Sequence, residues 1–167
     1  MPADSPPEIG LRRTTEDDVR VLHAFELDEA SNELAGTKSR DWPTFRARWQ
    51  QILADADGSV TGVTPRVILA DGVVVGAVNI APHEGRPSIG YWIGREHWGR
   101  GIATRAVELM LEEFTVRPLF ATAGGHNLPS LRVLEKSGFV VESRQWTPET
   151  TRCVARETVT LVLRPDF

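Results

Sequence analysis

EHWGRGIAT, residues 96–104, joins a β-rich run to a segment with helical periodicity, and this junction decides the fold expected for the chain. Gly99 and Gly101 stand one residue apart, which lets the backbone turn tightly and approach a ligand closely. The main-chain amides from about Gly99 to Thr104 would lack acceptors at the start of the helix, where the helix dipole is positive. These features predict a diphosphate site at a strand-to-helix turn.

The same stretch is a near miss to two other phosphate-binding motifs. As a P-loop beginning at Gly94, it has Arg100 in place of the lysine and Gly101 in place of the Ser or Thr that holds magnesium. As a dinucleotide fingerprint, it has Thr104 in place of the third glycine, and a hairpin precedes it where a βαβ unit would be expected. Both interpretations are therefore rejected.

The segments after this turn alternate between helix and strand. Apolar residues recur at helical spacing over residues 102–114, and a short β-rich run follows at 119–123. Residues 127–136 predict a second helix. Residues 139–144 and 157–163 predict the last two strands.

The segments before the turn begin with a short strand at Leu11 and a helix whose apolar stripe starts at Val19. Residues 31–40 are polar and predict an irregular connection. Asp41 followed by Pro43 predicts the start of another helix, because Asp accepts hydrogen bonds from free amides and proline is tolerated in the first turn.

Three strands are predicted between that helix and the glycine turn. Residues 66–70 and 73–80 predict a hairpin, because Asp71-Gly72 between them is a tight-turn signal, and residues 88–93 predict the third strand. The order of elements predicts a mixed α/β layer with a mostly antiparallel start and one parallel crossover through the helix at 102–114.

Composition and charge are those of an ordinary globular protein of 167 residues, 41% hydrophobic and 25% charged. No apolar run approaches the roughly 20 residues that span a bilayer, and the net charge of −4 argues against a nucleic-acid partner. The lone Cys153 cannot form an intramolecular disulfide, which favours a cytoplasmic location. The histidines show no metal-ligand spacing, so no metal is expected. Residues 1–10 are expected to be a disordered or extended lead-in, and 11–167 a single domain.

Two motifs, in order, resemble signatures of the GNAT N-acetyltransferases. Residues 98–103 (WGRGIA) resemble the Arg/Gln-x-x-Gly-x-Gly/Ala motif of the acetyl-CoA loop, with Trp98 in place of Arg or Gln. Residues 127–139 (NLPSLRVLEKSGF) resemble the second signature, at a spacing that fits one helix and one strand. The form of the first motif is similar to the branch that includes the RimJ and RimL ribosomal-protein N-terminal acetyltransferases. The resemblance covers roughly residues 67–163.

The resemblance implies a GNAT fold: an α/β (α+β) domain with a mixed sheet of about six to seven strands, a splayed parallel pair and about four helices. It implies acetyl-CoA as cosubstrate and acetyl transfer to a primary amine, on a small molecule or a protein N-terminus, by direct attack of the amine on the thioester. An alternative of a different class is a sensor module that binds acetyl-CoA without turnover. The Trp98 substitution and the absence of the tyrosine common in the family favour the sensor, whereas the intact glycines, Asn127 and Ser130 favour the enzyme.

The resemblance also implies a set of cofactor-binding residues around the glycine turn and the second motif. They are Trp92, Ile93, Trp98, Gly99, Arg100, Gly101, Ile102, Ala103, Thr104, Asn127 and Ser130. Trp92 and Ile93 could also be core residues, and Asn127 could be a helix N-cap. For these three positions both the structural role and the cofactor-binding role stay open.

Ser130 is the candidate acid for the leaving thiolate. Many family members carry a tyrosine four residues after this serine, but that position is Leu134 here, and the only tyrosine, Tyr91, lies on the strand before the glycine turn. Glu84, beside His83 at the end of the second hairpin strand, is the candidate general base; a solvated turn residue is the alternative reading.

The acceptor side is expected between the two N-terminal helices and the last hairpin. Trp42, Trp49 and Trp146 are candidates for its walls, although Trp49 also falls on the apolar stripe of its helix. Family habit and the β-rich C-terminal end, which could leave an exposed edge strand, suggest a homodimer.

Overall fold

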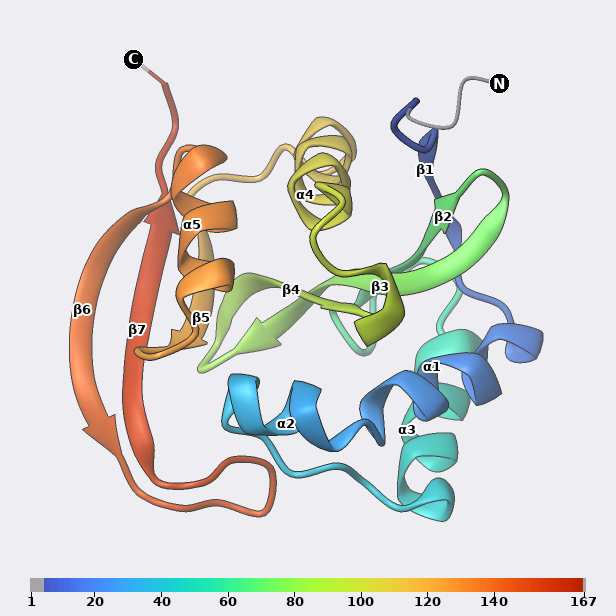
Figure 1. The fold of residues 1–167 in the computed structure, drawn as a ribbon, viewed down its shortest axis with the longest axis horizontal. Helices are drawn as coiled ribbons and strands as arrows, with labels where there is room; N and C mark the ends of the chain where they lie inside the picture. Colours follow the sequence, from blue (N-terminus) through green and yellow to red (C-terminus); the bar gives the residue numbers. More distant parts are fainter. Residues whose placement is uncertain (1–4, 167) are drawn as a thin grey trace.

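The computed structural model describes residues 5–166, which form a seven-stranded mixed sheet with helices on both faces (Figure 1). The strand order is β1-β2-β3-β4-β5-β7-β6, and β4 and β5 are parallel whereas all other neighbours are antiparallel. The strands are β1 (Ile9–Arg13), β2 (Thr64–Ala70), β3 (Val73–His83), β4 (Arg86–Ile93), β5 (Leu119–Gly124), β6 (Val140–Thr147) and β7 (Arg156–Leu163).

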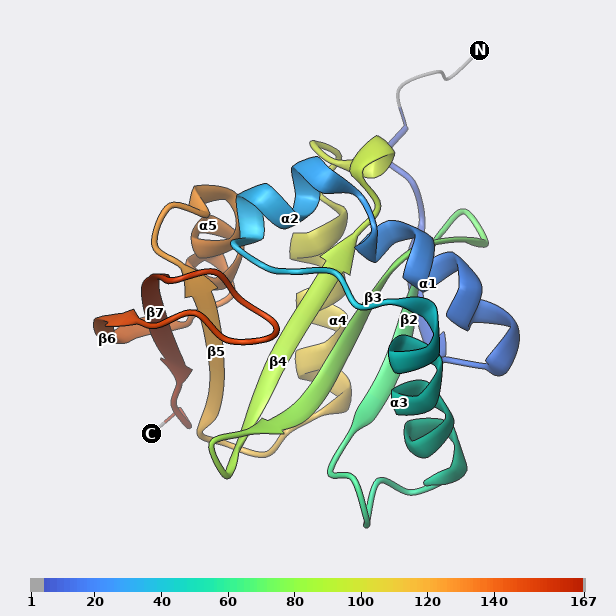
Figure 2. The same ribbon diagram turned by 90° about the horizontal axis from the view of Figure 1, so that it is seen from below.

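The helices divide between the two faces of the sheet (Figure 2). Helices α1 (Val19–Glu26) and α3 (Trp42–Ala54) cover one face, and α4 (Ile102–Glu113) and α5 (Leu128–Lys136) cover the other. The remaining helix, α2 (Glu29–Ala35), lies across the carboxyl end of β4. Helix α4 makes the parallel crossover from β4 to β5 that the sequence predicts.

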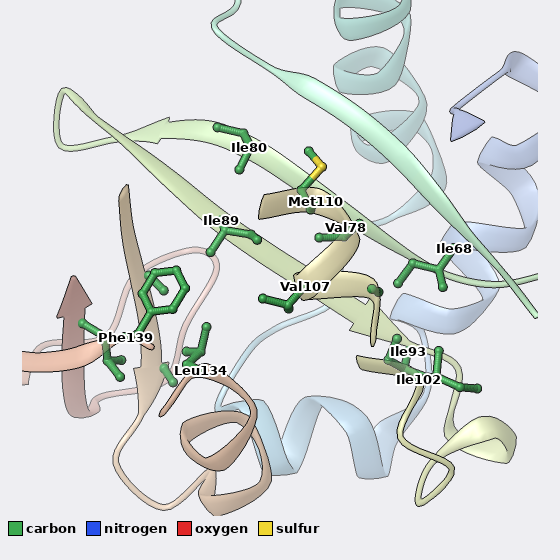
Figure 3. Close-up of a cluster of buried hydrophobic side chains, with 14 of the residues drawn as sticks. Ile68, Val78, Ile80, Ile89, Ile93, Ile102, Val107, Met110, Leu134 and Phe139 are labelled. Carbon is green, nitrogen blue, oxygen red and sulfur yellow. The ribbon is translucent and has the colours of Figure 1, made fainter. Parts of the chain in front are cut away.

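The larger hydrophobic core lies between the sheet and helices α4 and α5 (Figure 3). Alternate strand residues face it, because side chains at i and i+2 of a strand share a face; Ile89 and Ile93 of β4 are examples. The core side chains labelled in Figure 3 are Ile68, Val78, Ile80, Ile89, Ile93, Ile102, Val107, Met110, Leu134 and Phe139. This packing fixes the starts of α4 and α5 beside the end of β4.

Most predicted elements are present, and the predicted cap of α3 is confirmed by the Asp41 carboxylate, which accepts a hydrogen bond from the Thr44 amide at 2.8 Å. The expectation of an irregular segment at 31–40 is wrong, because α2 reaches Ala35. Asp28 caps this helix by accepting from the Ser31 amide at 2.9 Å, and Gly36 ends it in the left-handed region.

At the N-terminus, β1 begins at Ile9, where the sequence predicted a lead-in through residue 10. Ile9 pairs with Ala70 and Gly10 with Leu69, so these two residues belong to the sheet. The first four residues of the expected lead-in lie outside the described part of the chain. None of the helices in residues 5–166 is both long and apolar enough to span a bilayer.

The register between β3 and β4 depends on Gly76, and replacing it tests the fold. Gly76 pairs with Ile93, and a Cβ at this position would overlap the carbonyl oxygen of Trp92. We expect Gly76→Ala to lower the free energy of unfolding by about 3 kcal/mol, the upper end of typical overpacking costs. Gly10→Ala, where an added Cβ meets nothing within 4 Å, should change it by less than about 1 kcal/mol. Urea unfolding of both variants measures the difference, and equal stabilities would contradict the prediction.

Candidate functional site

A cavity of about 450 Å³ opens at the carboxyl end of β4. The end of β4, the β4–α4 loop, the first turns of α4 and α5 and one side of α2 surround it. Its lining residues are Ser31, Leu34, Ala35, Tyr91, Trp92, Ile93, His97, Trp98, Gly99, Gly101, Ile102, Ala103, Thr104, Asn127, Pro129, Ser130 and Val133. Ten of the eleven predicted cofactor-binding residues are in this set, so the structure brings the two sequence motifs together around one cavity.

The cavity exists because β4 and β5 separate. Their parallel pairing is recorded only at Ser88 and Phe120, near the beginning of each strand. Beyond this point β4 continues to Ile93 and β5 to Gly124 without pairing to each other. The edges that face each other there carry main-chain donors and acceptors that a parallel partner would otherwise use.

The glycine loop has the geometry that its sequence predicts. Gly99 and Gly101 have φ angles of 75° and 73°, in the left-handed region that favours glycine. Gly101 is the N-cap of α4, and the first hydrogen bond of the helix runs from the Arg105 amide to the Gly101 carbonyl. Within residues 5–166, the amides of residues 99–104 donate to no protein acceptor. Free amides at the positive end of a helix dipole favour an anion, which is what the sequence predicts for this turn.

Arg100 and Trp98 take different positions in this loop. The side chain of Arg100 is exposed and does not line the cavity, so only its main-chain amide belongs to the anion site. Trp98, which replaces the Arg or Gln of the motif, donates its indole N–H to the Ile93 carbonyl at 3.0 Å. The indole therefore closes the β4–α4 loop and supplies an apolar wall, and its polar atom is not available to a phosphate.

The corner between α1 and α2 holds this loop from the other side. Trp92 donates its indole N–H to the Phe25 carbonyl at 3.0 Å, and the Phe25 ring packs on Gly94 so closely that a Cβ there would lie 2.6 Å from it. Asp28 pairs with Arg95 at 3.2 Å. An ion pair this exposed contributes little to stability, so the ring packing and the part-buried hydrogen bond set the position of the loop.

Asn127 and Ser130 meet at the start of α5. The Asn127 side-chain oxygen accepts from the Ser130 amide at 3.3 Å, so Asn127 is the N-cap, and it also lines the cavity. Its side-chain NH₂ group donates to no acceptor among the described residues and is free for a ligand. The cap and the ligand readings of Asn127 are therefore compatible.

The structure adds Tyr91, for which the sequence pattern predicts no role. Its hydroxyl lies 2.8 Å from Ser130 Oγ, and burial raises the pKa of the phenol to about 12 although the Ser130 hydrogen bond opposes the shift. The signal that could have placed it is the two-residue period of β4. Tyr91 shares a face with Ile89 and Ile93, and this is the face that α5 covers.

Other predicted residues lie away from the cavity. Glu84 and His83 are exposed at the β3–β4 turn, at the opposite end of β4 from the glycine loop, so the structure does not bring the predicted base to the site. Trp42 and Trp49 line a separate cavity between α1 and α3, and Trp49 is core. Trp146 is 71% exposed on the edge strand β6. These positions depend on how distant elements pack, which a linear sequence pattern does not contain.

Comparisons with known proteins agree with this geometry. A family model described as an acetyltransferase (GNAT) domain matches residues 8–140. The uncharacterized N-acetyltransferase p20 of Bacillus licheniformis is 33% identical over 67 residues, which are 38% of this chain and 38% of p20. The chain therefore aligns with less than half the length of this curated relative.

Two solved structures share the fold. RimJ of Mycobacterium smegmatis, in complex with CoA-disulfide, has a TM-score of 0.74 and 25% identity, covering 93% of this chain and 81% of RimJ. An acetyltransferase of Salmonella typhimurium that modifies the N-terminal serine of ribosomal protein L7/L12 has a TM-score of 0.76 and 19% identity, covering 97% of each chain. The latter likeness concerns the fold alone.

The close contact at Gly94 predicts how the loop depends on the α1–α2 corner. Gly94→Ala would push the Phe25 ring and shift the loop amides from their positions. We expect this variant to bind coenzyme A at least about tenfold more weakly, the effect of losing about 1.4 kcal/mol. Gly90→Ala on the same strand, where an added Cβ meets nothing within 4 Å, should keep wild-type affinity. Calorimetric titration with coenzyme A compares them, and equal affinities would show that the corner does not position the loop.

Proposed function

The chain belongs to the GNAT acetyltransferase family, and from this we propose that it transfers the acetyl group of acetyl-CoA to a primary amine. The observation that carries the proposal is the row of unpaired amides from Gly99 to Thr104, at the mouth of a cavity that continues toward the gap between β4 and β5. A diphosphate linked to a long, narrow arm matches this shape, and coenzyme A has both parts.

In the proposed complex the diphosphate binds the amides of the glycine loop. The pantetheine arm lies beside Trp92 and Ile93, on the edge of β4 that β5 leaves unpaired. Because the Ile93 carbonyl already accepts from the Trp98 indole, the Ile93 amide is the main-chain group offered to the arm. The Asn127 NH₂ group donates to the arm, and Ser130 lies near the sulfur. Trp98 places an apolar side chain where the Arg or Gln of the motif would make a polar contact with the cofactor. Because main-chain amides supply most of the diphosphate binding, the affinity for coenzyme A is retained.

The reaction requires a neutral amine to attack the thioester carbonyl. Unperturbed amines have pKa values from about 8 (α-amine) to about 10.4 (lysine), so a proton must leave before attack. No carboxylate is among the described residues that line the cavity. We therefore assign the removal of this proton to solvent and the stabilisation of the leaving sulfur to the Ser130 hydroxyl.

The acceptor is proposed to approach from the face of β4 opposite Tyr91. Gly90 lies on that face, is exposed, and would leave an added Cβ without neighbours within 4 Å. In Figure 2 the connection between α2 and α3 passes across this face of the sheet, and the loop between β6 and β7 lies beside it. An open approach suits either a small amine or an extended protein N-terminus, and the two classes are separated by the assay below.

The activity is tested by thiol release from acetyl-CoA in the presence of two acceptor panels, small-molecule amines and short peptides with free N-termini. We expect release with at least one panel, accompanied by the mass of an acetylated product. Tight binding of acetyl-CoA with no release for any amine would favour the sensor alternative. Failure to bind coenzyme A would overturn the proposal.

Ser130→Ala tests the role of the serine in this reaction. We expect kcat to fall about 10- to 100-fold, because the leaving sulfur loses its hydrogen-bond donor, while the Kd for acetyl-CoA stays within about twofold. Ser137→Ala, which removes a serine at the end of the same helix whose hydroxyl donates to the Val133 carbonyl, is the matched control. An unchanged turnover in Ser130→Ala would refute the assignment.

Gly90→Leu tests the direction of acceptor approach. A leucine side chain there would extend over the exposed surface beside the gap between β4 and β5. We expect the KM for the amine to rise at least about tenfold, as for the loss of about 1.4 kcal/mol of binding, with acetyl-CoA affinity unchanged. Gly10→Leu, the same change on the distant edge strand β1, should leave both constants alone. Unaltered amine kinetics in Gly90→Leu would show that the amine enters elsewhere.

A further inference from the structure

The structure supplies a partner for the serine hydroxyl. We propose that Tyr91 is a positioning residue for Ser130: its hydroxyl donates a hydrogen bond to Ser130 Oγ and leaves the serine proton free for the thioester sulfur. The inference rests on the proposed acetyl transfer, since that reaction brings the sulfur to Ser130.

The two hydroxyls come from different elements that border the cavity. Tyr91 is on β4 and Ser130 in the first turn of α5, 39 residues apart, and both line the cavity. The contact between Tyr91 Oη and Ser130 Oγ is 2.8 Å, a normal length for two hydroxyls, whereas the Ser130 carbonyl is 3.4 Å from Tyr91 Oη. The serine hydroxyl is thus the better acceptor for the phenol proton.

Each hydroxyl has one proton to donate, so the direction of this bond decides what remains. With Tyr91 as donor, Ser130 Oγ accepts from the phenol and its own proton is free to turn into the cavity. Because burial raises the pKa of Tyr91 to about 12, the phenol stays protonated at neutral and moderately alkaline pH. The donor is therefore present at every pH at which an amine acetyltransferase would work.

The reaction balances without a proton leaving the tyrosine. The amine nitrogen bonds to the carbonyl carbon, the C–S bond breaks, and its electron pair goes to sulfur. The Ser130 hydroxyl, strengthened as a donor by Tyr91, stabilises the developing thiolate. A thiolate is less basic than a phenolate, with a thiol pKa near 8.5, so Tyr91 keeps its proton. The proton released by the amine nitrogen passes through solvent and neutralises the thiolate.

Tyr91→Phe removes the hydroxyl and keeps the ring. We expect kcat to fall about tenfold, the kinetic equivalent of about one hydrogen bond, while the KM for acetyl-CoA and the Kd for coenzyme A stay within about twofold. The double variant Tyr91→Phe/Ser130→Ala should be no slower than Ser130→Ala alone, because the tyrosine acts only through the serine. A double variant whose loss in kcat equals the product of the two single losses would overturn the inference. A wild-type kcat in Tyr91→Phe would overturn it as well.

The single tyrosine of the chain gives an isosteric test that does not depend on the variants folding. Growth on a polyfluorinated tyrosine replaces the Tyr91 phenol alone with a more acidic one. We expect kcat of this protein to decline in the alkaline range where the wild-type kcat is level, because the fluorinated phenol ionises and no longer donates. His97, the other titratable residue lining the cavity, is unaltered. A pH profile identical to the wild type would contradict the proposed role.

The two proposals fail in different ways. Wild-type protein that releases no thiol with any amine would overturn the acetyl transfer and, with it, the role of Tyr91. Wild-type turnover with no effect of either Tyr91 change would overturn the positioning role alone.

Discussion

Strands β4 and β5 pair at Ser88 and Phe120 and then separate, and the candidate site depends on this divergence. A parallel pair that continued to the ends of both strands would close the gap and satisfy its own main-chain groups. The divergence instead leaves these groups to a ligand, and it places the starts of α4 and α5 on either side of the opening. The free amides of α4 and the Asn127 cap of α5 thereby serve a single cavity.

The N-terminal helices α1 and α2 also hold the end of β4 and border the cavity. The carbonyl of Phe25 accepts from Trp92, and the ring of Phe25 occupies the space above Gly94, so the α1–α2 corner is locked to the end of β4. Helix α2, which continues from this corner, forms a wall of the cavity through Ser31 and Leu34. One group of contacts therefore sets both this wall of the cavity and the position of the glycine loop.

A buried carboxylate ties this region to the C-terminal hairpin. Burial alone would raise the pKa of Glu26, but hydrogen bonds from Arg40 and the charges of Arg40 and Arg152 outweigh it, so the pKa lies below its usual value. Arg40 comes from the α2–α3 connection and Arg152 from the β6–β7 connection. Removing either arginine would leave the buried Glu26 carboxylate with less compensation. This would lower the free energy of unfolding more than the loss of an exposed ion pair does.

By itself the sequence determined those features whose physics is local. Two glycines before a helical stripe specify a turn with free amides, Asp71-Gly72 specifies a hairpin, and Asp41 specifies the start of α3, because each acts within a few residues. The second motif also fixed the start of α5 at Asn127, where one side chain both caps the helix and lines the cavity.

Only the tertiary structure decided which distant side chains meet. Tyr91 reaches Ser130 because β4 and α5, although far apart in the sequence, pack on one core. Glu84 lies far from the cavity because it precedes β4, and the cavity is at the other end of that strand. Helix α2 was missed because its stability comes from a cap and from packing against other elements, neither of which an apolar period reveals. Contacts of this kind depend on how whole elements are arranged, and a linear pattern does not contain that information.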